Sequence, residues 1–171
     1  SILVIDYMVI DEPFRGNNTF FEFTSQVRKY FINYGFSYVV AEIVYNSEGP
    51  EPSEKSKNLI RLLKIAHFKV IKAPYYHPML GVTNFESEMK AVLMIYNVED
   101  HDRIKKETYN MIVNTIYYKH YLRWYDKFLI DQNKINYINA LGRLFAKIQS
   151  EIEDKSFIEL NGHHHLPTRS E

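Results

Sequence analysis

The feature that most limits the fold is an apolar, β-branched run at residues 2–10, which leads through a polar turn into a helical pattern. Proline, glycine and asparagine residues within positions 13–18 mark the turn. Apolar side chains then recur at the three- and four-residue spacing of a helix with one buried face: Phe20, Phe23, Val27, Tyr30, Phe31 and Tyr34. A second apolar run follows at residues 38–45. Two strands joined by a helix predict a parallel pair with a right-handed crossover.

Helix signals extend this pattern along the chain. Thr19 and Glu22 have the spacing of a capping box, so the first helix is expected to begin there, and Gly35 stands where a C-terminal glycine cap belongs. The remaining predicted elements are a helix, two strands and a long helical stretch that breaks near residues 130–133; they fall at residues 53–66, 68–72, 89–98 and 102–154.

The order β-α-β-α-β-β, followed by helices, predicts an α/β (α+β) fold. We expect an α/β half domain at residues 1–98, a helical extension at 99–156 and a flexible tail at 157–171. The chain begins inside a predicted strand. We therefore expect an upstream half of the same protein, or a partner chain, to complete the sheet.

Composition excludes several classes of function. The chain of 171 residues has no cysteine, which rules out disulfides, thiolate catalysis and cysteine-bound zinc. Lys+Arg and Asp+Glu both number 21, so no net charge favours nucleic acid or an anionic membrane as a partner. No apolar run approaches the ~20 residues of a membrane span, and no signal peptide is visible. These features predict a cytoplasmic protein.

A strand, a tight turn and a helix N-terminus form a general device for binding phosphate, because the first amide groups of a helix are free. Here that segment resembles the pyrophosphate-loop region of the GNAT-type N-acetyltransferases, and it reads VIDEPFRGNNTFFEFTSQVRKYFINYGFSYVVAEI. The segment SKNLIRLLKIAHFKVI resembles the second conserved helix of the family and the strand after it. The segment APYYHPMLG, followed by the strand MKAVLMIY, resembles a bacterial subgroup that has a Tyr-x-Gln-Pro-x-Leu stretch before its last strand and a helical C-terminal tail. The resemblance covers about residues 2–98.

The resemblance implies acetyl-CoA as the acyl donor. The backbone of Met8, Val9 and Ile10 would hold the thioester carbonyl. The pyrophosphate would lie on the loop and helix start, formed by Arg15, Gly16, Asn17, Asn18, Thr19 and Phe20. Asn18 and Phe20 depart from the glycines of the family, and the Phe20 ring either turns into the core and leaves the cofactor slot open or fills that slot. We expect it to turn inward.

The resemblance also points to catalytic residues. Glu42 matches an acidic residue of the subgroup in an otherwise apolar strand, and His77 stands where the subgroup has Gln. Either side chain is a candidate base for an amine. Leu63 takes the place of the tyrosine that protonates the departing thiolate in the family, so Tyr75, Tyr76 or solvent would supply that proton.

Two functions therefore stand side by side. The first is an N-acetyltransferase that moves an acyl group from acetyl-CoA to an unknown amine. The second is a catalytically inactive relative that serves as a binding or interaction module. The aromatic residues of the helix around residues 117–128 share one face, which favours core packing over nucleic-acid stacking. Consecutive histidines at 163–165 on a tail do not preorganise a site, so we expect no metal.

Overall fold

The computed structural model describes residues 1–6, 8–16, 18–46, 51–78, 89–97 and 99–162. Over these residues the chain forms an α+β fold built on a mixed seven-stranded sheet. The strands are β1 (Ile2–Ile5), β2 (Tyr38–Val44), β3 (Lys69–Ile71), β4 (Tyr75–His77), β5 (Met89–Asn97), β6 (Arg103–Lys105) and β7 (Phe157–Asn161). The helices are η1 (Glu12–Phe14), α1 (Thr19–Asn33), α2 (Glu54–Ile65), α3 (Lys106–Asn114), the π-helix η2 (Thr115–Leu122), α4 (Arg123–Tyr125) and α5 (Asp131–Glu151).

The strands are ordered β1-β2-β5-β3-β7-β6, and β4 also pairs with β5. β1 and β2 are parallel neighbours joined through α1, which confirms the pairing predicted from the sequence. All the other strand pairs are antiparallel. The long strand β5 is central, since it pairs with β2 along one edge and with β3 and β4 along the other.

The first strand is shorter than predicted. β1 ends at Ile5 rather than at residue 10, and its last pair in the ladder is Ile5 with Ala41. β2 continues three residues further, to Val44, and these residues stay paired with β5. The β1–β2 ladder therefore stops before β2 does, and the chain leaves the sheet at Asp6.

Helix α1 differs from the sequence prediction at its start and on its buried face. Its N-cap is Asn18, in the left-handed region at φ 62°, and the predicted capping box does not form. The Thr19 hydroxyl instead donates to the Phe14 carbonyl at 2.9 Å. Phe31 is fully buried, whereas three of the residues assigned to the inner face are largely exposed: Phe23, Tyr30 and Tyr34. The buried face thus lies on the side of Thr24 and Phe31.

Helix α2 follows the prediction closely, with Ser53 as its N-cap and a boundary at Ile65. The Ser53 hydroxyl accepts from the Ser56 amide, which satisfies one of the free donors of the first turn. Ser56 is buried, and its own hydroxyl donates to the Val44 carbonyl at 2.7 Å. This bond ties the start of α2 to the end of β2.

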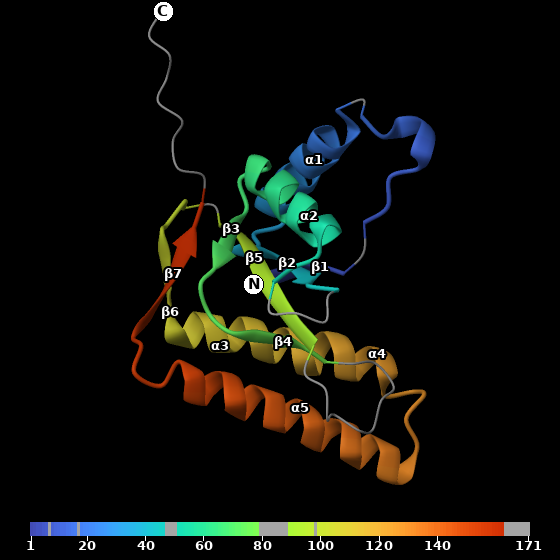
Figure 1. Ribbon diagram of the computed structural model, residues 1–171, viewed down its shortest axis with the longest axis vertical. Helices are drawn as coiled ribbons and strands as arrows, with labels where there is room; N and C mark the ends of the chain where they lie inside the picture. Colours follow the sequence, from blue (N-terminus) through green and yellow to red (C-terminus); the bar gives the residue numbers. More distant parts are fainter. Residues whose placement is uncertain (7, 17, 47–50, 79–88, 98, 163–171) are drawn as a thin grey trace, which may run out of the picture.

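The sheet separates two helical layers (Figure 1). Helices α1 and α2 cover one face, and their core contains Phe31, Val39, Ala41, Ile43, Leu63, Ala66, Phe68, Val92 and Met94. Helices α3, η2 and α5 cover the other face over a larger core, to which Val40, Leu93 and Ile95 of the sheet contribute. Alternate residues of β2 thus enter opposite cores, as the two-residue period of a strand requires.

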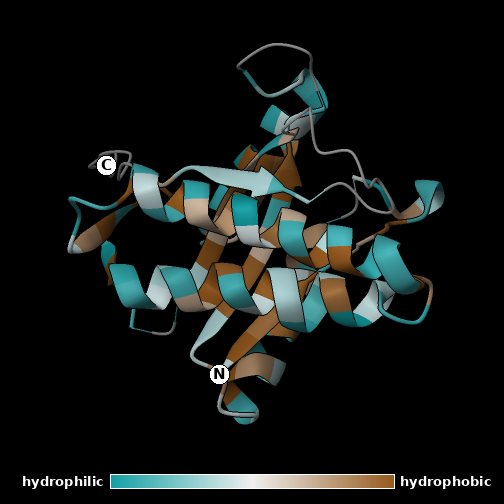
Figure 2. Cartoon of the chain, turned by 90° about the horizontal axis from the view of Figure 1, so that it is seen from below, coloured by the Kyte–Doolittle hydropathy of each residue, from teal (hydrophilic) through white to brown (hydrophobic). Residues whose placement is uncertain are grey.

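The C-terminal part departs from the predicted helix-and-tail arrangement. Arg103–Lys105 form strand β6, so the helix expected from residue 102 begins only at Lys106. The segment from Phe157 to Asn161, predicted to be part of a flexible tail, is strand β7, which pairs with both β3 and β6. The α3–α4 segment and α5 lie side by side across the sheet (Figure 2). The C-terminal region therefore shares the sheet and the larger core with the rest of the chain.

Tyrosine hydroxyls attach these helices to the strands. Tyr109 donates to the Pro74 carbonyl at 2.7 Å, and Tyr117 donates to the Tyr76 carbonyl at 2.5 Å. Both rings are fully buried, and Tyr117 packs on Tyr75 with ring centroids 5.8 Å apart. Most buried phenols have a partner of this kind. The Tyr75 hydroxyl is an exception, since it is buried with no partner among the described residues.

These tyrosines predict a loss of stability at alkaline pH. The pKa values of Tyr75 and Tyr117 are raised mainly by burial and, to a smaller extent, by the nearby negative charge of Glu42. Burial also raises the pKa of Tyr109. Above about pH 10 the unfolded chain therefore loses phenolic protons that the folded chain keeps. The free energy of unfolding then falls by up to about 1.4 kcal/mol per pH unit for each buried tyrosine.

Urea unfolding followed between pH 8 and pH 11.5 measures this slope. Tyr109→Phe removes one titrating group and makes the slope shallower. The exposed Tyr34→Phe is the matched control, with the slope of the parent protein. An identical slope for parent and Tyr109→Phe would contradict the prediction.

Candidate functional site

Three polar side chains from distant parts of the sequence meet at the sheet face below η2. Glu42 lies on β2, His77 ends β4, and Tyr121 lies on η2. His77 Nδ1 is 2.5 Å from Glu42 Oε1, and the Tyr121 hydroxyl donates to Glu42 Oε2 at 2.5 Å. The structure thus brings together the two side chains proposed as bases from the sequence and adds a phenol to them.

Local structure explains these positions. Glu42 lies on the same face of β2 as Val40 and Val44, since side chains two residues apart in a strand share a face. It therefore points toward the larger core rather than toward α1 and α2. His77 lies two residues after the buried Tyr75 on β4 and faces the same side. Tyr121 is carried by a π-helical segment, a rare conformation that is frequent at functional sites.

The hydrogen bonds assign the protons of the cluster. Glu42 receives one bond on each carboxylate oxygen, from the Tyr121 hydroxyl and from His77 Nδ1. Opposite an ionised carboxylate, which can only accept, Nδ1 carries the hydrogen, and Nε2 is then the ring nitrogen that can accept a proton. The side chains of Glu42 and His77 are 10% and 16% exposed, so the pair is shielded from bulk water.

Buried phenols surround the Glu42 carboxylate. The pKa of Tyr121 lies well above its ordinary value, first because the ring is buried and second because Glu42 is negatively charged. The same two causes raise the pKa of Tyr75 and Tyr117. These phenols therefore stay neutral around neutral pH, and Tyr121 serves as a hydrogen-bond donor to the carboxylate.

The cluster opens onto a cavity of about 180 Å³ at the point where β1 leaves the sheet. Its lining combines strand ends with the π-helix: Val4, Ile5, Asp6, Glu42, Val44, His77, His120 and Tyr121. Acid–base groups are present, whereas none of these described lining residues is a serine, threonine or lysine. The carboxylate, imidazole and phenol groups of the cavity are of the types that transfer protons in general acid–base catalysis.

A second polar pair lies at the mouth of this cavity. His120 Nε2 is 3.1 Å from Asp6 Oδ1, and the His120 ring meets the Tyr121 ring at a centroid distance of 4.9 Å. Asp6 is the residue that follows β1, and its side chain is 57% exposed. The pair connects the end of β1 to η2 and places a carboxylate beside the opening.

The predicted phosphate loop has the backbone shape of a tight turn. Gly16 has φ 86° and Asn18 has φ 62°, and Asn17 lies outside the described residues. The Asn18 carbonyl accepts from the amides of Phe21 and Glu22, which begins α1. Phe20 is half-buried and packs against the core under α1 and α2, so its ring turns inward as expected.

The predicted thioester-binding segment is not part of β1. Met8 and Ile10 are half-buried, and Val9 is 59% exposed. The Ile10 carbonyl accepts from Arg15 Nε at 2.9 Å, which fixes the loop against this segment. The prediction of a strand through residue 10 is thus wrong, while the position of these backbone groups beside the loop is retained.

Leu63, which cannot donate a proton, and the candidate donors Tyr75 and Tyr76 lie away from the cavity. Leu63 is 1% exposed and belongs to the core under α1 and α2. Tyr76 donates to Glu151 Oε1 at 2.7 Å, and Tyr75 is buried against Tyr117. None of the three lines the cavity beside Glu42.

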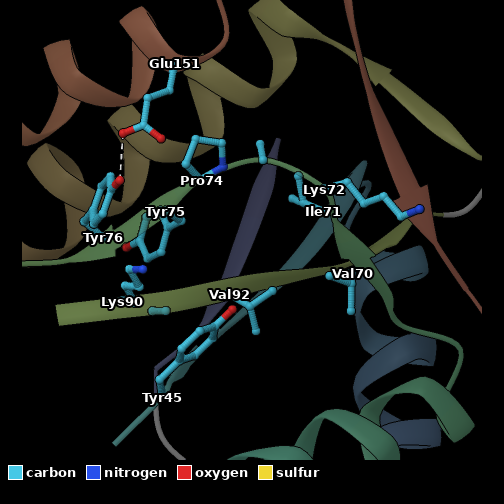
Figure 3. Close-up of a pocket in the computed structure, with 12 residues that line it drawn as sticks. Tyr45, Val70, Ile71, Lys72, Pro74, Tyr75, Tyr76, Lys90, Val92 and Glu151 are labelled. Carbon is cyan, nitrogen blue, oxygen red and sulfur yellow. Dashed lines mark hydrogen bonds between the residues drawn. The ribbon is translucent and has the colours of Figure 1, made fainter. Parts of the chain in front are cut away.

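A larger cavity of about 430 Å³ is lined by residues of β3, β4 and β5 (Figure 3), and neither Glu42 nor His77 lines it. It opens where the chain between β3 and β4 departs from β5, and Figure 3 shows the Tyr76–Glu151 hydrogen bond at its rim. Lys72 and Lys90 also line it. Tyr76 and Glu151 bond to each other and Lys72 and Lys90 are exposed, whereas the Tyr75 hydroxyl is buried with no partner among the described residues. The smaller cavity brings three hydrogen-bonded side chains together, and we therefore take it as the better functional site.

Sequence reasoning missed Asp6, His120 and Tyr121. Tyr121 was assigned to the core with its neighbouring aromatics, which is correct for its ring and overlooks its hydroxyl. The sequence feature that could have indicated these residues is His120 next to Tyr121, both within an apolar helical segment. Most buried phenols have a polar partner, and a glutamate inside an apolar strand is a candidate for that partner.

Within the described residues, no group of three or more potential ligand side chains could hold a metal ion, and every helix is too short or too polar to cross a bilayer. The histidines at 163–165 lie outside those residues. Comparisons with known proteins assign no family: no protein-family model matches the chain, and no curated protein or solved structure matches it significantly.

Proposed function

We propose that this protein is an N-acyltransferase that transfers an acyl group from acetyl-CoA to an amine. The observation that carries the proposal is the Glu42–His77–Tyr121 cluster beside a cavity at the end of the β1–β2 ladder. An imidazole held by a carboxylate is a well-placed base for an ammonium group. The parallel β1–α1–β2 unit supports the resemblance to the GNAT-type acetyltransferases on which the donor is assigned.

In the proposed reaction, His77 Nε2 takes a proton from the ammonium group of the acceptor. Glu42 stabilises the imidazolium that forms, and Tyr121 holds the carboxylate in place. The amine nitrogen then attacks the thioester carbonyl carbon; the C–N bond forms, the C–S bond breaks, and the nitrogen loses its second proton to solvent. The thiolate takes its proton from solvent, and His77 releases the proton that it gained. The products are an amide, CoA and one proton.

The donor would lie along the segment from residue 8 to the start of α1. Backbone groups of Met8, Val9 and Ile10 would hold the thioester, and the free amides at the start of α1 would face the pyrophosphate. Arg15 would add a positive charge there, and the inward position of Phe20 keeps its ring in the core. The close approach of the reactants then supplies most of the rate enhancement.

Acetyl-CoA binding tests the donor site separately from the chemistry. We expect calorimetry to give a micromolar dissociation constant, and Arg15→Ala to weaken binding by about threefold to tenfold through loss of one exposed charge contact. S-acetylpantetheine, which lacks the pyrophosphate, should bind parent and variant equally. Lys29→Ala, an exposed change on α1, is the matched control. No binding of acetyl-CoA at millimolar concentration would rule out the proposed donor.

One observation favours the second candidate function, a catalytically inactive binding module. Leu63 is buried where the family carries a tyrosine, so the chain lacks that acid. The module would bind without turnover. Acetyl-CoA binding with no amine-dependent release of CoA would support it over the transferase.

A further inference from the structure

The cavity beside Glu42 continues into a groove on the helical layer. His120 lines this cavity, a second of about 210 Å³ and a third of about 400 Å³. Tyr121 and Asp6 are shared by the first two cavities, and Trp124 by the last two. The three hollows therefore adjoin one another along η2 and α4. We call the outermost one the helical groove, lined by Lys119, His120, Arg123, Trp124 and Lys127.

The helical groove is positively charged. Lys119, Arg123 and Lys127 follow one another at four-residue spacing, and no acidic residue lines the groove. Among the described residues Lys119 and Arg123 form no ion pair, and the neighbouring carboxylate of Asp126 is taken by Lys134 at 2.5 Å. Two unneutralised cations in one concave site favour an anionic ligand group.

The wall between the groove and the cavity is aromatic. Trp124 is 57% exposed and Phe128 is 68% exposed, although sequence periodicity placed both in the core. They line the middle hollow together with Tyr125. Lys127 Nζ lies 5.5 Å from the Trp124 ring centroid and 4.9 Å from that of Phe128. Exposed rings beside unpaired cations suit a ligand with an apolar body and an anionic end.

We propose that the helical groove binds the acceptor of the transfer, and that this acceptor is an amine with an anionic group at the far end of an apolar or aromatic body. The inference rests on the proposed acyltransferase function. Lys119 and Arg123 hold the anionic group, which is a carboxylate or a phosphate, and Trp124 and Phe128 cover the apolar body. The amine then enters the inner cavity past the Asp6 carboxylate, which attracts an ammonium group, and reaches His77.

Trp124 is the single tryptophan of the chain, so its fluorescence reports the groove without any need for turnover. The probes are 4-(aminomethyl)benzoate and 4-methylbenzylamine, which share the ring and the amine and differ in the carboxylate. We expect the carboxylate probe to change the emission saturably, with a dissociation constant at least about tenfold lower than that of the neutral probe. High salt should reduce this difference.

The double variant Lys119→Gln/Arg123→Gln should remove the preference for the carboxylate and leave binding of the neutral probe unchanged. Lys29→Gln/Arg61→Gln makes the same charge change on α1 and α2 and should retain the preference. O-phosphotyramine compared with tyramine distinguishes a phosphate acceptor from a carboxylate acceptor.

Equal affinity for the two probes, or a double variant with unaltered preference, would overturn the inference. So would a loss of acetyl-CoA affinity in the double variant, since the groove would then belong to the donor. Emission that changes with protein concentration, together with dimers in sedimentation, would assign the groove to a second copy of the chain. Selective binding of the amino carboxylate without its acetylation would uphold the groove and contradict the proposed function.

Discussion

Replacing His77 by Gln is expected to lower kcat/KM for acetyl transfer by about 100-fold to 10,000-fold, the usual contribution of a general base. Glutamine has a similar size but cannot accept a proton at the position of Nε2. Glu42→Gln should cost a similar factor, because the imidazole loses the carboxylate that orients it and stabilises its protonated form. Steady-state kinetics with acetyl-CoA and an accepted amine measure both effects.

The controls for this prediction keep the residue types and change the location. His101→Gln and Glu107→Gln alter exposed side chains outside the cavity and should leave kcat/KM unchanged. Acetyl-CoA affinity should be the same in all four variants, because none of these side chains lies in the proposed donor site. The double variant His77→Gln/Glu42→Gln should have a kcat/KM only slightly below that of either single variant, as expected for residues that act as a unit. Full activity of His77→Gln would remove His77 from the mechanism.

Tyr117→Ala is expected to give the largest loss of stability, about 3–5 kcal/mol in the free energy of unfolding. The ring is fully buried between the sheet and the helical layer, and its hydroxyl holds the Tyr76 carbonyl. Tyr117→Phe keeps the volume and leaves that carbonyl without its donor, so its cost should be about 1–3 kcal/mol. Urea unfolding followed by circular dichroism measures both.

The same experiment tests whether the helical layer and the sheet unfold together. Tyr34→Ala is the matched control, since Tyr34 is 67% exposed and should change the free energy by about 0.5 kcal/mol or less. A single transition shifted to lower urea by Tyr117→Ala is the expected result. Two transitions, with only one of them sensitive to Tyr117→Ala, would show that the C-terminal helices fold independently of the sheet.

Several helices and strands could be predicted from short sequence patterns alone. The parallel β1–β2 pair, the limits of α2 and strand β5 follow from apolar runs, a serine cap and glycine or proline punctuation. The short strands β4, β6 and β7 were not predicted, whereas the equally short β3 was predicted within an apolar run closed by Pro74. Their positions depend on which edge of the sheet they meet, and a sequence pattern does not contain that information.

Some residues of the candidate site could likewise be predicted from the sequence, and others could not. Glu42 and His77 were identified from their own neighbourhoods and from the resemblance, but their contact depends on β2 and β4 flanking the same strand. Tyr121, Trp124 and Phe128 show the other limit. A helical period of 3.6 residues assigned all three to one buried face, whereas the π-helical turn before Arg123 changes the phase and leaves the last two exposed.

The most direct test of the proposed function is the release of CoA thiol from acetyl-CoA in the presence of amines, followed with a thiol reagent and confirmed by mass spectrometry of the amide. We expect amine-dependent release that forms one amide per thiol and is lost in His77→Gln, while His101→Gln behaves like the parent protein. Release that does not depend on the amine, or that is equal in the parent and in His77→Gln, would contradict an acyltransferase centred on Glu42 and His77.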